Sequence, residues 1–331
     1  MEAEIQEKIN QKTKPLGSLG RLEAIALQVA KVQKSLSPQF SKPTIVVFTG
    51  DHGLAKEAVS AYPQEVTYQM VLNFLHGGAA INVFCKANGL DLTVVDCGVI
   101  GEFSETAGLL HAKIAHGTNN SLHEPAMTSE QYQRAWQSGE KIVKDLFRSG
   151  CNLVGFGEMG IGNTSAASLI MSDLCGIPIE ECYGSGTGVV GDALQHKLKI
   201  LQQVQEKHGR QGESSKSLQI FGGFEIVQMS AAMLTAYECG MTLLIDGFIS
   251  TVAYLAAYEM QERLADNAIF SHVSGESGHR KLLNYLQAEP LLDLQLRLGE
   301  GSACAVAYPI VRNSLDFFNG MASFASAGVS Q

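Results

Sequence analysis

The glycine-rich run at residues 157–164 carries the groups in this chain best suited to holding an anion. It reads Gly157-Glu-Met-Gly-Ile-Gly-Asn-Thr164, and it links the short apolar segment 153–156 to a helical pattern that starts at residue 165. Glycines let successive backbone N–H groups point to one spot, and the unpaired N–H groups at the start of a helix add positive charge there. The run therefore predicts a phosphate site.

The glycine spacing in this run partly fits two nucleotide-binding patterns. Gly155, Gly157 and Gly160 match a dinucleotide fingerprint, but no acidic residue closes a second strand about 20 residues later, where a ribose would need it. The run also resembles a Walker loop in which Asn163 replaces the lysine. A site for a single phosphate group fits this run better than a dinucleotide site or a Walker-type site does. A tight strand-to-helix turn without a ligand is the alternative.

One carboxylate near the end of the chain has the setting of a general base. Glu300 lies between Gly299 and Gly301, ahead of the apolar run 303–307. Burial there would raise the pKa of the Glu300 carboxyl toward neutrality, where a carboxylate accepts protons efficiently. The alternative is a surface turn or a helix-capping carboxylate.

Two other stretches could complete such a site. A second glycine-rich loop at 184–191 precedes a helical pattern with Asp192 and Lys197, and it could add phosphate or ribose contacts. It could equally be a flexible connection. The stretch 60–70 offers aromatic, amide and thioether groups suited to a flat heterocycle, although such side chains also occur in ordinary cores.

Histidine-containing segments do not have the spacing of a metal site. Asp51-His52 and the segment 271–280 contain acidic and imidazole groups, but neither matches a zinc-binding pattern. We expect these residues to brace loops by hydrogen bonds, and we expect no metal site.

The pattern of the whole chain predicts an α/β fold that brings these segments together. Short β-branched runs alternate with helix-length patterns, which is typical of an open, doubly wound parallel sheet. Predicted strands cover 44–49, 92–96, 153–156, 218–221, 243–245 and 268–273, and predicted helices cover 21–35, 66–87, 130–148, 165–175, 189–207, 225–237 and 250–264. Glycine clusters follow several of the strands, so four turns converge at the sheet's carboxyl edge, where ligands bind. The segment 205–217 is predicted to be an exposed loop.

Composition limits the classes of partner. The chain has 331 residues, 45% of them apolar, with a formal charge of −9. The apolar fraction is ample for a full core. The negative charge argues against binding to nucleic acid or an anionic membrane. Seven cysteines without a C-x-x-C pair, and a polar amino-terminal segment without a signal-like apolar stretch, predict a reduced, cytoplasmic location.

Ordered sequence blocks then indicate a family. The chain resembles the nicotinate-nucleotide–dimethylbenzimidazole phosphoribosyltransferases, which make α-ribazole phosphate for the lower loop of cobalamin. The blocks are KTKPLGSLGRLE (12–23), GDHG (50–53), VSAYPQEVTYQM (59–70), GEMGIGNT (157–164), GSGTGV (184–189), GGFEI (222–226), DGFI (246–249), GHR (278–280), LRLGEGS (296–302) and ASAGVS (325–330).

This resemblance implies a fold, an activity and an assembly. It implies a Rossmann-like sheet flanked by helices at 41–280, a small helical domain from 1–40 and 281–331, and a homodimer without a cofactor. The implied reaction transfers the phosphoribosyl group of nicotinate mononucleotide to 5,6-dimethylbenzimidazole. The same donor with another aromatic acceptor, such as a purine or a phenol, is the alternative. Two further alternatives from other classes are a nucleotide-binding regulatory protein and a dinucleotide oxidoreductase.

The resemblance also assigns roles residue by residue. Glu300 becomes the general base. The phosphate and ribose contacts fall on Glu158, Gly160, Ile161, Gly162, Asn163, Thr164, Gly184, Ser185 and Gly186. The base pocket falls on Ser60, Tyr62, Gln69, Met159 and Leu298. Met159 stands where some relatives have leucine, and Gly320 and Ser323 depart from the usual ending, which affects only the expected acceptor preference.

Overall fold

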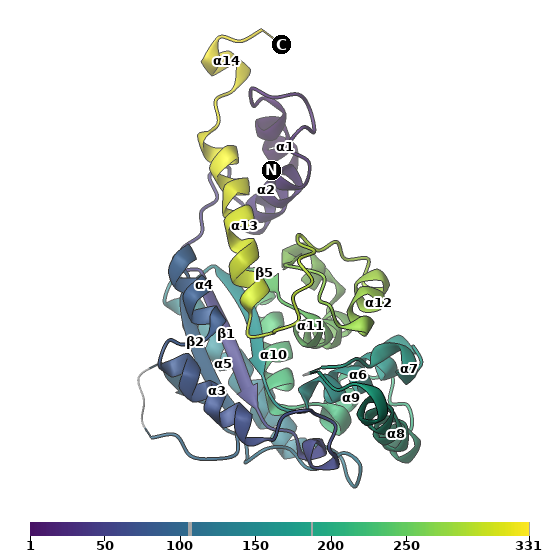
Figure 1. The fold of residues 1–331 in the computed structure, drawn as a ribbon. Coiled ribbons are helices and arrows are strands. Elements are labelled where there is room, and N and C mark those ends of the chain that lie inside the picture. The colour runs from purple at the N-terminus through teal and green to yellow at the C-terminus, as the bar shows by residue number, and fades with distance from the viewer. Residues whose placement is uncertain (105–107, 187, 331) are drawn as a thin grey trace.

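A six-stranded parallel sheet forms the centre of the protein (Figure 1). The computed structural model describes residues 1–104, 108–186 and 188–330. The strands are β1 (Thr44–Gly50), β2 (Asp91–Gly98), β3 (Leu109–His111), β4 (Leu153–Met159), β5 (Thr242–Ile245) and β6 (Ala268–Phe270). Their order is β3-β2-β1-β4-β5-β6. The prediction of a doubly wound α/β fold is confirmed.

The strand order places a reversal at the middle of the sheet. β1 pairs with β2 on one side and with β4 on the other, and Phe48 and Thr49 lie beside Glu158 and Met159. The chain therefore builds the sheet outward from β1 in one direction and then, from β4, in the other. In open parallel sheets a ligand crevice forms at the carboxyl ends of the two strands that flank such a reversal.

Helices cover both faces of the sheet. The α-helices are α1 (Glu2–Asn10), α2 (Arg21–Val32), α3 (Glu65–Leu75), α4 (Ala80–Asn88), α5 (Ser129–Arg148), α6 (Asn163–Cys175), α7 (Ile179–Cys182), α8 (Gly191–His208), α9 (Ser214–Phe221), α10 (Phe224–Glu238), α11 (Phe248–Met260), α12 (Ser277–Tyr285), α13 (Ser302–Gly320) and α14 (Phe324–Ala327). The 3₁₀ helices are η1 (Gly53–Glu57) and η2 (Glu262–Asn267). Across the described ranges, none of the helices has both the length and the apolar character needed to cross a membrane.

Alternate residues of the strands enter two separate cores. Val46 and Phe48 of β1 pack in the core that contains α5, α6, α10 and α11, whereas Ile45 and Val47 pack in the core that contains α3, α4 and the start of α13. All seven residues of β1 are buried. This continuous burial is typical of a central parallel strand covered on both faces.

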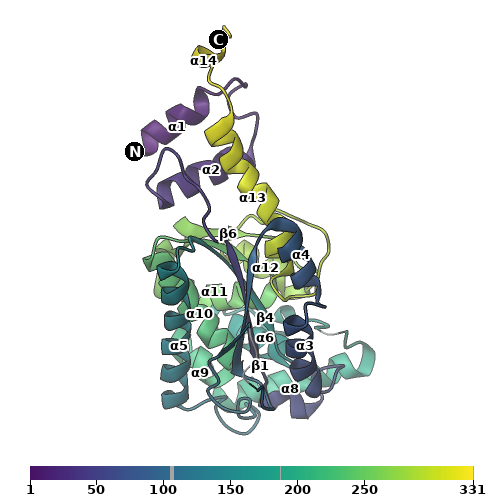
Figure 2. The same cartoon turned by 90° about the vertical axis from the view of Figure 1, so that its left-hand side faces the viewer.

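α13 connects the sheet to the amino-terminal helices (Figure 2). Its first half contributes Cys304 and Tyr308 to the core on the sheet, and Phe318 near its end packs with Ile5 and Ile9 of α1 in a small separate cluster. The two chain ends also meet through backbone hydrogen bonds, such as the one from the Phe324 N–H to the Gln11 carbonyl. The division into domains at 1–40, 41–280 and 281–331 stays a prediction.

Some of the predicted elements were wrong. Residues 218–221 are the end of α9 rather than a strand, because Leu218 and Phe221 bury the same face at helical spacing. The predicted helix 66–87 is two helices, since Gly77 adopts a left-handed φ of 79° and its N–H closes the end of α3 on the Phe74 carbonyl. The expected loop 205–217 consists mostly of the end of α8 and the start of α9, and β3 was not predicted.

The packing of α5 on α10 generates a stability prediction. A side chain on Gly139 of α5 would collide with the backbone of Gln228 in α10, so Gly139→Ala should lower the free energy of unfolding by about 1–3 kcal/mol through overpacking. Gly320→Ala is the matched control, because a side chain there meets no atom within 4 Å, and its effect should stay below about 1 kcal/mol. Urea denaturation measures both. Equal stabilities for the two variants would contradict the close approach of α5 and α10.

Candidate active site

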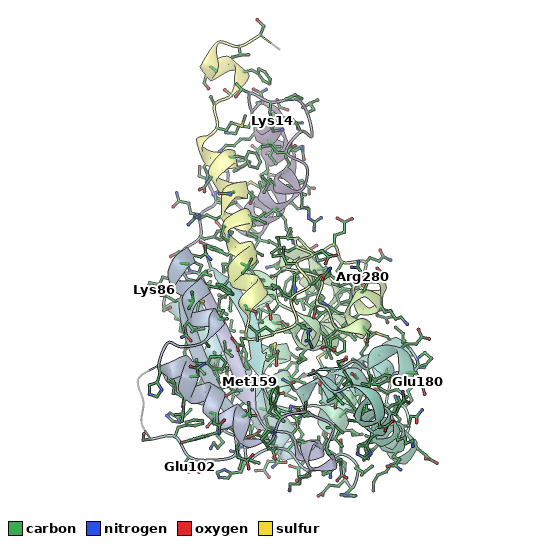
Figure 3. The ribbon with its side chains drawn as sticks, in the orientation of Figure 1. Lys14, Lys86, Glu102, Met159, Glu180 and Arg280 are labelled. Carbon is green, nitrogen blue, oxygen red and sulfur yellow. The ribbon has the colours of Figure 1, made fainter. Side chains whose placement is uncertain are left out.

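A cavity of about 110 Å³ lies where β4, β5 and β6 end at the carboxyl edge of the sheet. Its lining comes from 158–161, 163–164, 247–249 and 297–299, together with Gly186, His272, Ser274 and Glu276, and the predicted Gly162 is not part of it. Met159, at the end of β4, lies near the centre of the molecule (Figure 3). The glycine-rich run and the segment before Glu300, which are far apart in sequence, therefore meet at one place.

The glycine-rich run lies largely inside the protein. Glu158 and Met159 belong to β4, and Gly162 has a left-handed φ of 97° before α6. A side chain at Gly160 would collide with the Gly50 carbonyl oxygen at the end of β1. The Ile161 N–H donates to the Thr67 hydroxyl at 3.0 Å. Gly160 thus permits two strand ends to approach each other, and its predicted role of leaving room for an anion stays a prediction.

Two of the predicted phosphate residues contact each other. The Asn163 side-chain amide donates a hydrogen bond to the Glu158 carboxylate, and both residues are buried. Asn163 therefore holds Glu158 in place beside the cavity. Thr164, one residue later, lies beside the second glycine loop, because a side chain at Gly186 would come within 2.7 Å of its hydroxyl.

Glu300 is held in an unusual backbone conformation. Its φ is +65°, between Gly299 at +82° and Gly301 at +76°. Its N–H donates to the Glu158 carbonyl at 3.2 Å, and a side chain at Gly157 would collide with this turn. A left-handed conformation is costly for a residue other than glycine, and such residues persist where the surrounding structure holds them, often at functional sites.

Asp246, directly after β5, positions this turn and was not among the predicted site residues. Its carboxylate accepts hydrogen bonds from the N–H groups of Gly301 at 3.2 Å, Ala303 at 2.8 Å and Cys304 at 3.2 Å. It therefore caps the start of α13 from another part of the chain. The available signal was an aspartate followed by glycine at the end of a predicted strand, but its partner lies more than fifty residues later.

Three buried carboxyl groups lie near one another at the carboxyl edge of the sheet, and of these Glu158 lines the cavity. Burial raises the pKa of Glu300 to about 7, although a hydrogen bond from the Ile81 backbone at the start of α4 opposes the shift. Burial, reinforced by the charge of Asp246, raises the pKa of Glu158 to about 8. Burial also raises the pKa of Asp246 to about 7, although backbone hydrogen bonds oppose it. Near neutral pH this group of carboxyls can therefore take up a proton.

Lys197 of α8 supplies a positive charge beside Thr164 and the second glycine loop. Its side chain is fully buried, and its ammonium group donates to the Thr164 hydroxyl at 3.2 Å and to the Gly184 carbonyl at 3.0 Å. Burial lowers the pKa of Lys197 to about 8, and the nearby Glu276 carboxylate opposes this shift. Lys197 thereby joins the two glycine loops that sequence reasoning treated separately.

The second glycine loop lies partly outside the cavity. Gly186 lines the cavity, whereas Gly184 and Ser185 line a neighbouring cavity of about 450 Å³ that shares Glu276 and Arg297 with the first. Residue 187 of this loop lies outside the described residues.

The structure gathers only part of the predicted base pocket. Met159 and Leu298 line the cavity. Ser60, Tyr62 and Gln69 are not among its lining residues, and Tyr62 is 54% exposed. Glu300 itself is buried behind its neighbours Leu298 and Gly299. The base-binding roles of Ser60, Tyr62 and Gln69 stay predictions.

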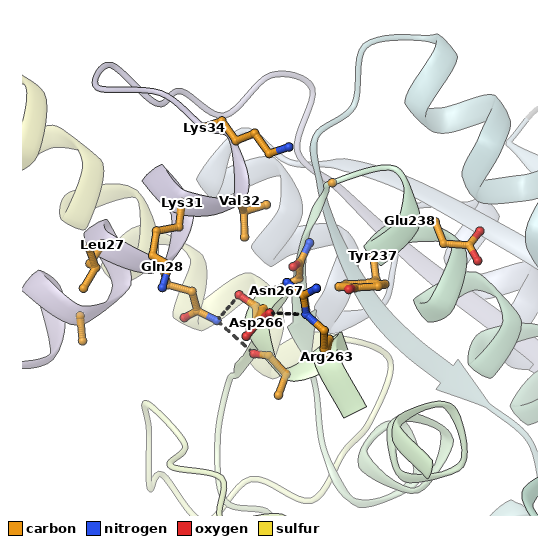
Figure 4. A pocket seen from close by; sticks show the side chains of 13 residues that line it. Leu27, Gln28, Lys31, Val32, Lys34, Tyr237, Glu238, Arg263, Asp266 and Asn267 are labelled. Carbon is orange, nitrogen blue, oxygen red and sulfur yellow. Dashed lines mark hydrogen bonds and ion pairs between the residues drawn. The ribbon is translucent and has the colours of Figure 1, made fainter. Parts of the chain in front are cut away.

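Among the described residues, no group of three or more His, Cys, Asp or Glu side chains is arranged to hold a metal ion. A larger cavity of about 650 Å³ lies between α2 and η2, before β5 and β6 begin (Figure 4). Its charged side chains are exposed, and some of them are paired, as in the Arg263–Asp266 contact at 3.5 Å. We therefore place the candidate active site at the opposite edge of the sheet.

Comparisons with known proteins identify the family of this chain. A family model described as phosphoribosyltransferase matches residues 1–329. The chain is 52% identical over 333 aligned residues to the nicotinate-nucleotide–dimethylbenzimidazole phosphoribosyltransferase of Dechloromonas aromatica, covering 100% of this chain and 96% of that protein. It is 49% identical to the protein of the same name from Aromatoleum aromaticum, covering 99% and 95%.

A solved structure extends the similarity to three dimensions. The crystal structure of CobT from Thermus thermophilus superposes with a TM-score of 0.95 at 40% identity, covering 100% of this chain and 99% of that one. Sequence and fold thus agree over the full described length. The chain belongs to the nicotinate-nucleotide–dimethylbenzimidazole phosphoribosyltransferase family.

Proposed function

We propose that this enzyme transfers the phosphoribosyl group of nicotinate mononucleotide to 5,6-dimethylbenzimidazole, releasing nicotinate and forming α-ribazole 5′-phosphate. The observation that carries the proposal is the Glu300 carboxylate. It is 4% exposed, its pKa is raised to about 7, and its strained turn lies beside a cavity at the sheet's carboxyl edge. The names of the relatives favour dimethylbenzimidazole over a purine or phenol acceptor.

In the proposed reaction, the configuration at the ribose C1′ inverts. One ring nitrogen of the benzimidazole forms a bond to C1′ while the bond from C1′ to the nicotinate nitrogen breaks on the opposite face. The electron pair of the broken bond neutralises the pyridinium ring, so nicotinate leaves without protonation. Glu300 accepts the proton from the second ring nitrogen of the acceptor, which becomes acidic as positive charge develops on it.

The phosphate end of the donor would be held by groups on the other side of the cavity. Lys197 provides the charge, and the Thr164 hydroxyl and the Gly186 backbone lie next to it. Anchoring the phosphate fixes C1′ against the acceptor, and such orientation can supply several kcal/mol of barrier lowering. Among the predicted phosphate and ribose contacts, we assign Thr164 and Gly186 to the phosphate and Glu158 to a ribose hydroxyl.

We also propose that the protein is a homodimer in the cytoplasm. Several apolar side chains near α3, α4 and β3 are exposed and would be covered by a second copy. These residues are Tyr62, Val83, Ile100 and Leu110. All seven cysteines are free thiols, which fits a reducing compartment.

Replacing Glu300 tests the general base. Glu300→Gln should lower kcat by at least about a hundredfold while substrate binding changes little, because the amide fills the same space but cannot accept the proton. Nicotinate release and calorimetric binding of nicotinate mononucleotide measure the two effects. Glu262→Gln, an exposed carboxylate in η2, is the control and should keep full activity. A Glu300→Gln enzyme with normal kcat would exclude this role.

Replacing Lys197 tests the phosphate site. Lys197→Met keeps the long apolar stem but removes the charge, so it should weaken binding of nicotinate mononucleotide by roughly tenfold or more. KM for the nucleotide should rise more than kcat falls, whereas KM for the benzimidazole should stay close to normal. Lys199→Met, on the same helix, is the control. Unchanged nucleotide affinity in a folded Lys197→Met enzyme would move the phosphate elsewhere.

The raised carboxyl pKa values predict how stability depends on pH. In the unfolded chain the carboxyl groups have already lost their protons at about pH 6.5. In the folded state Glu158 loses its proton only between about pH 6.5 and 8, because burial raises its pKa to about 8. The folded state binds more protons, so the free energy of unfolding should fall as pH rises. Urea denaturation without substrate measures this fall in the free energy of unfolding. In Glu158→Gln the fall between about pH 6.5 and 8 should be smaller than in the unaltered protein by roughly 1–2 kcal/mol. The same pH slope in both proteins would show that Glu158 is already ionised.

A further inference from the structure

Glu276 lies where the two glycine loops and Lys197 come together. It directly precedes α12 and occupies the helix N-cap position, yet its side chain makes no capping hydrogen bond there. Instead its carboxylate accepts a hydrogen bond from the Gly186 N–H at 3.3 Å. A carboxylate at the N-cap position is normally stabilised by the N–H groups at the start of its own helix. Here it is turned toward the second glycine loop.

The glycine loop is shaped around this carboxylate. A side chain at Gly184 would collide with a Glu276 carboxylate oxygen. The Ser277 hydroxyl, next in the chain, donates to the Tyr183 carbonyl at 2.7 Å and fixes the start of α12 against the loop. Backbone N–H groups of a glycine loop form an anion-binding position. In this structure that position holds the anion of Glu276.

The charges of Glu276 and Lys197 influence each other. The Glu276 carboxylate opposes the lowering of the Lys197 pKa, and Lys197 in turn opposes the raising of the Glu276 pKa by burial. No ion pair shorter than 4.0 Å joins them in the part of the chain that the structure describes. Glu276 is therefore a distant counter-charge for a buried cation. A phosphate, with more charge and more acceptor oxygens, would be a stronger partner for the same groups.

Glu276 also separates two spaces. It lines both the cavity of about 110 Å³ beside the first glycine run and the cavity of about 450 Å³ beside Gly184 and Ser185. Pockets for small-molecule ligands usually measure about 300–1,000 Å³, so the first cavity alone is too small for a nucleotide. Because Glu276 lines both cavities, a rotation of its side chain away from Gly186 would open the space between them.

We propose that the Glu276 carboxylate occupies the position of the substrate's 5′-phosphate and is displaced by it, so that Glu276 competes with the phosphate for the Gly186 N–H beside Lys197 and weakens phosphate binding. This inference rests on the proposed function and adds a residue that sets the affinity for the phosphorylated donor. A nucleoside without a phosphate offers Lys197 and the Gly186 N–H no replacement anion, so it cannot displace Glu276. A phosphorylated donor can.

The test is binding of inorganic phosphate, nicotinate mononucleotide and nicotinate riboside to the full chain, measured by calorimetry. Glu276→Gln should raise the affinity for phosphate and for the nucleotide by at least about fivefold, because a competing like charge is removed. Affinity for the riboside should rise much less. Glu181→Gln is the control, because this exposed carboxylate pairs with Lys281 and lines neither cavity.

A second variant and a double replacement keep the test decisive. Glu276→Asp retains the charge but is one methylene shorter, so it should lose the Gly186 contact and also bind phosphate more tightly. In a Lys197→Met background the gain from Glu276→Gln should largely disappear, since both anions depend on the same cation. Unchanged or weaker phosphate binding in folded Glu276 variants would overturn the proposal.

Loss of cooperative unfolding in both Glu276 variants would also overturn it, because the carboxylate would then be a structural requirement of the loop. Phosphate binding is measured without turnover. If the unaltered protein failed to release nicotinate, the proposed function would fail while the result for Glu276 would still be readable.

Discussion

The candidate site depends on the contact between the turn at 299–301 and the end of β4. Three successive residues of this turn have left-handed backbones, and one of them, Glu300, is not a glycine. The conformation is held by the Glu158 carbonyl and the Asp246 carboxylate, and the missing side chain of Gly157 lets the turn approach the strand. Such a conformation costs on the order of 1–3 kcal/mol and persists only where surrounding contacts over-determine it.

The same contact links the site to the rest of the molecule. α13 starts at this turn, where Asp246 caps it, and then packs on the sheet. Its far end reaches the cluster that contains Ile5 and Phe318. One helix therefore connects the amino-terminal helices to the turn that contains Glu300. The glycine at the end of α3 has a related effect, because ending that helix allows α4 to begin with the Ile81 N–H near Glu300.

Charged groups of both signs lie near the site. Glu158, Asp246 and Glu300 influence one another near the start of α13, whereas Lys197 lies beside the second glycine loop. Nicotinate mononucleotide carries a negative phosphate at one end, which a buried lysine can pair with. In a chain with a formal charge of −9, a phosphate must be held by such local groups, because the overall field of the protein repels it.

The sequence by itself determined the features that depend on neighbouring residues. Alternating apolar strands and helices predicted the doubly wound sheet, and glycines after the strands predicted the edge at which the candidate site is placed. Glu300 stood out because its flanking glycines are visible in the local sequence. Only the tertiary structure decided how distant groups combine: Asp246 with the start of α13, Lys197 with Thr164, and Glu276 with Gly186. Hydrogen bonds and pKa shifts depend on burial and on distances between segments far apart in the chain, and no local pattern encodes those quantities.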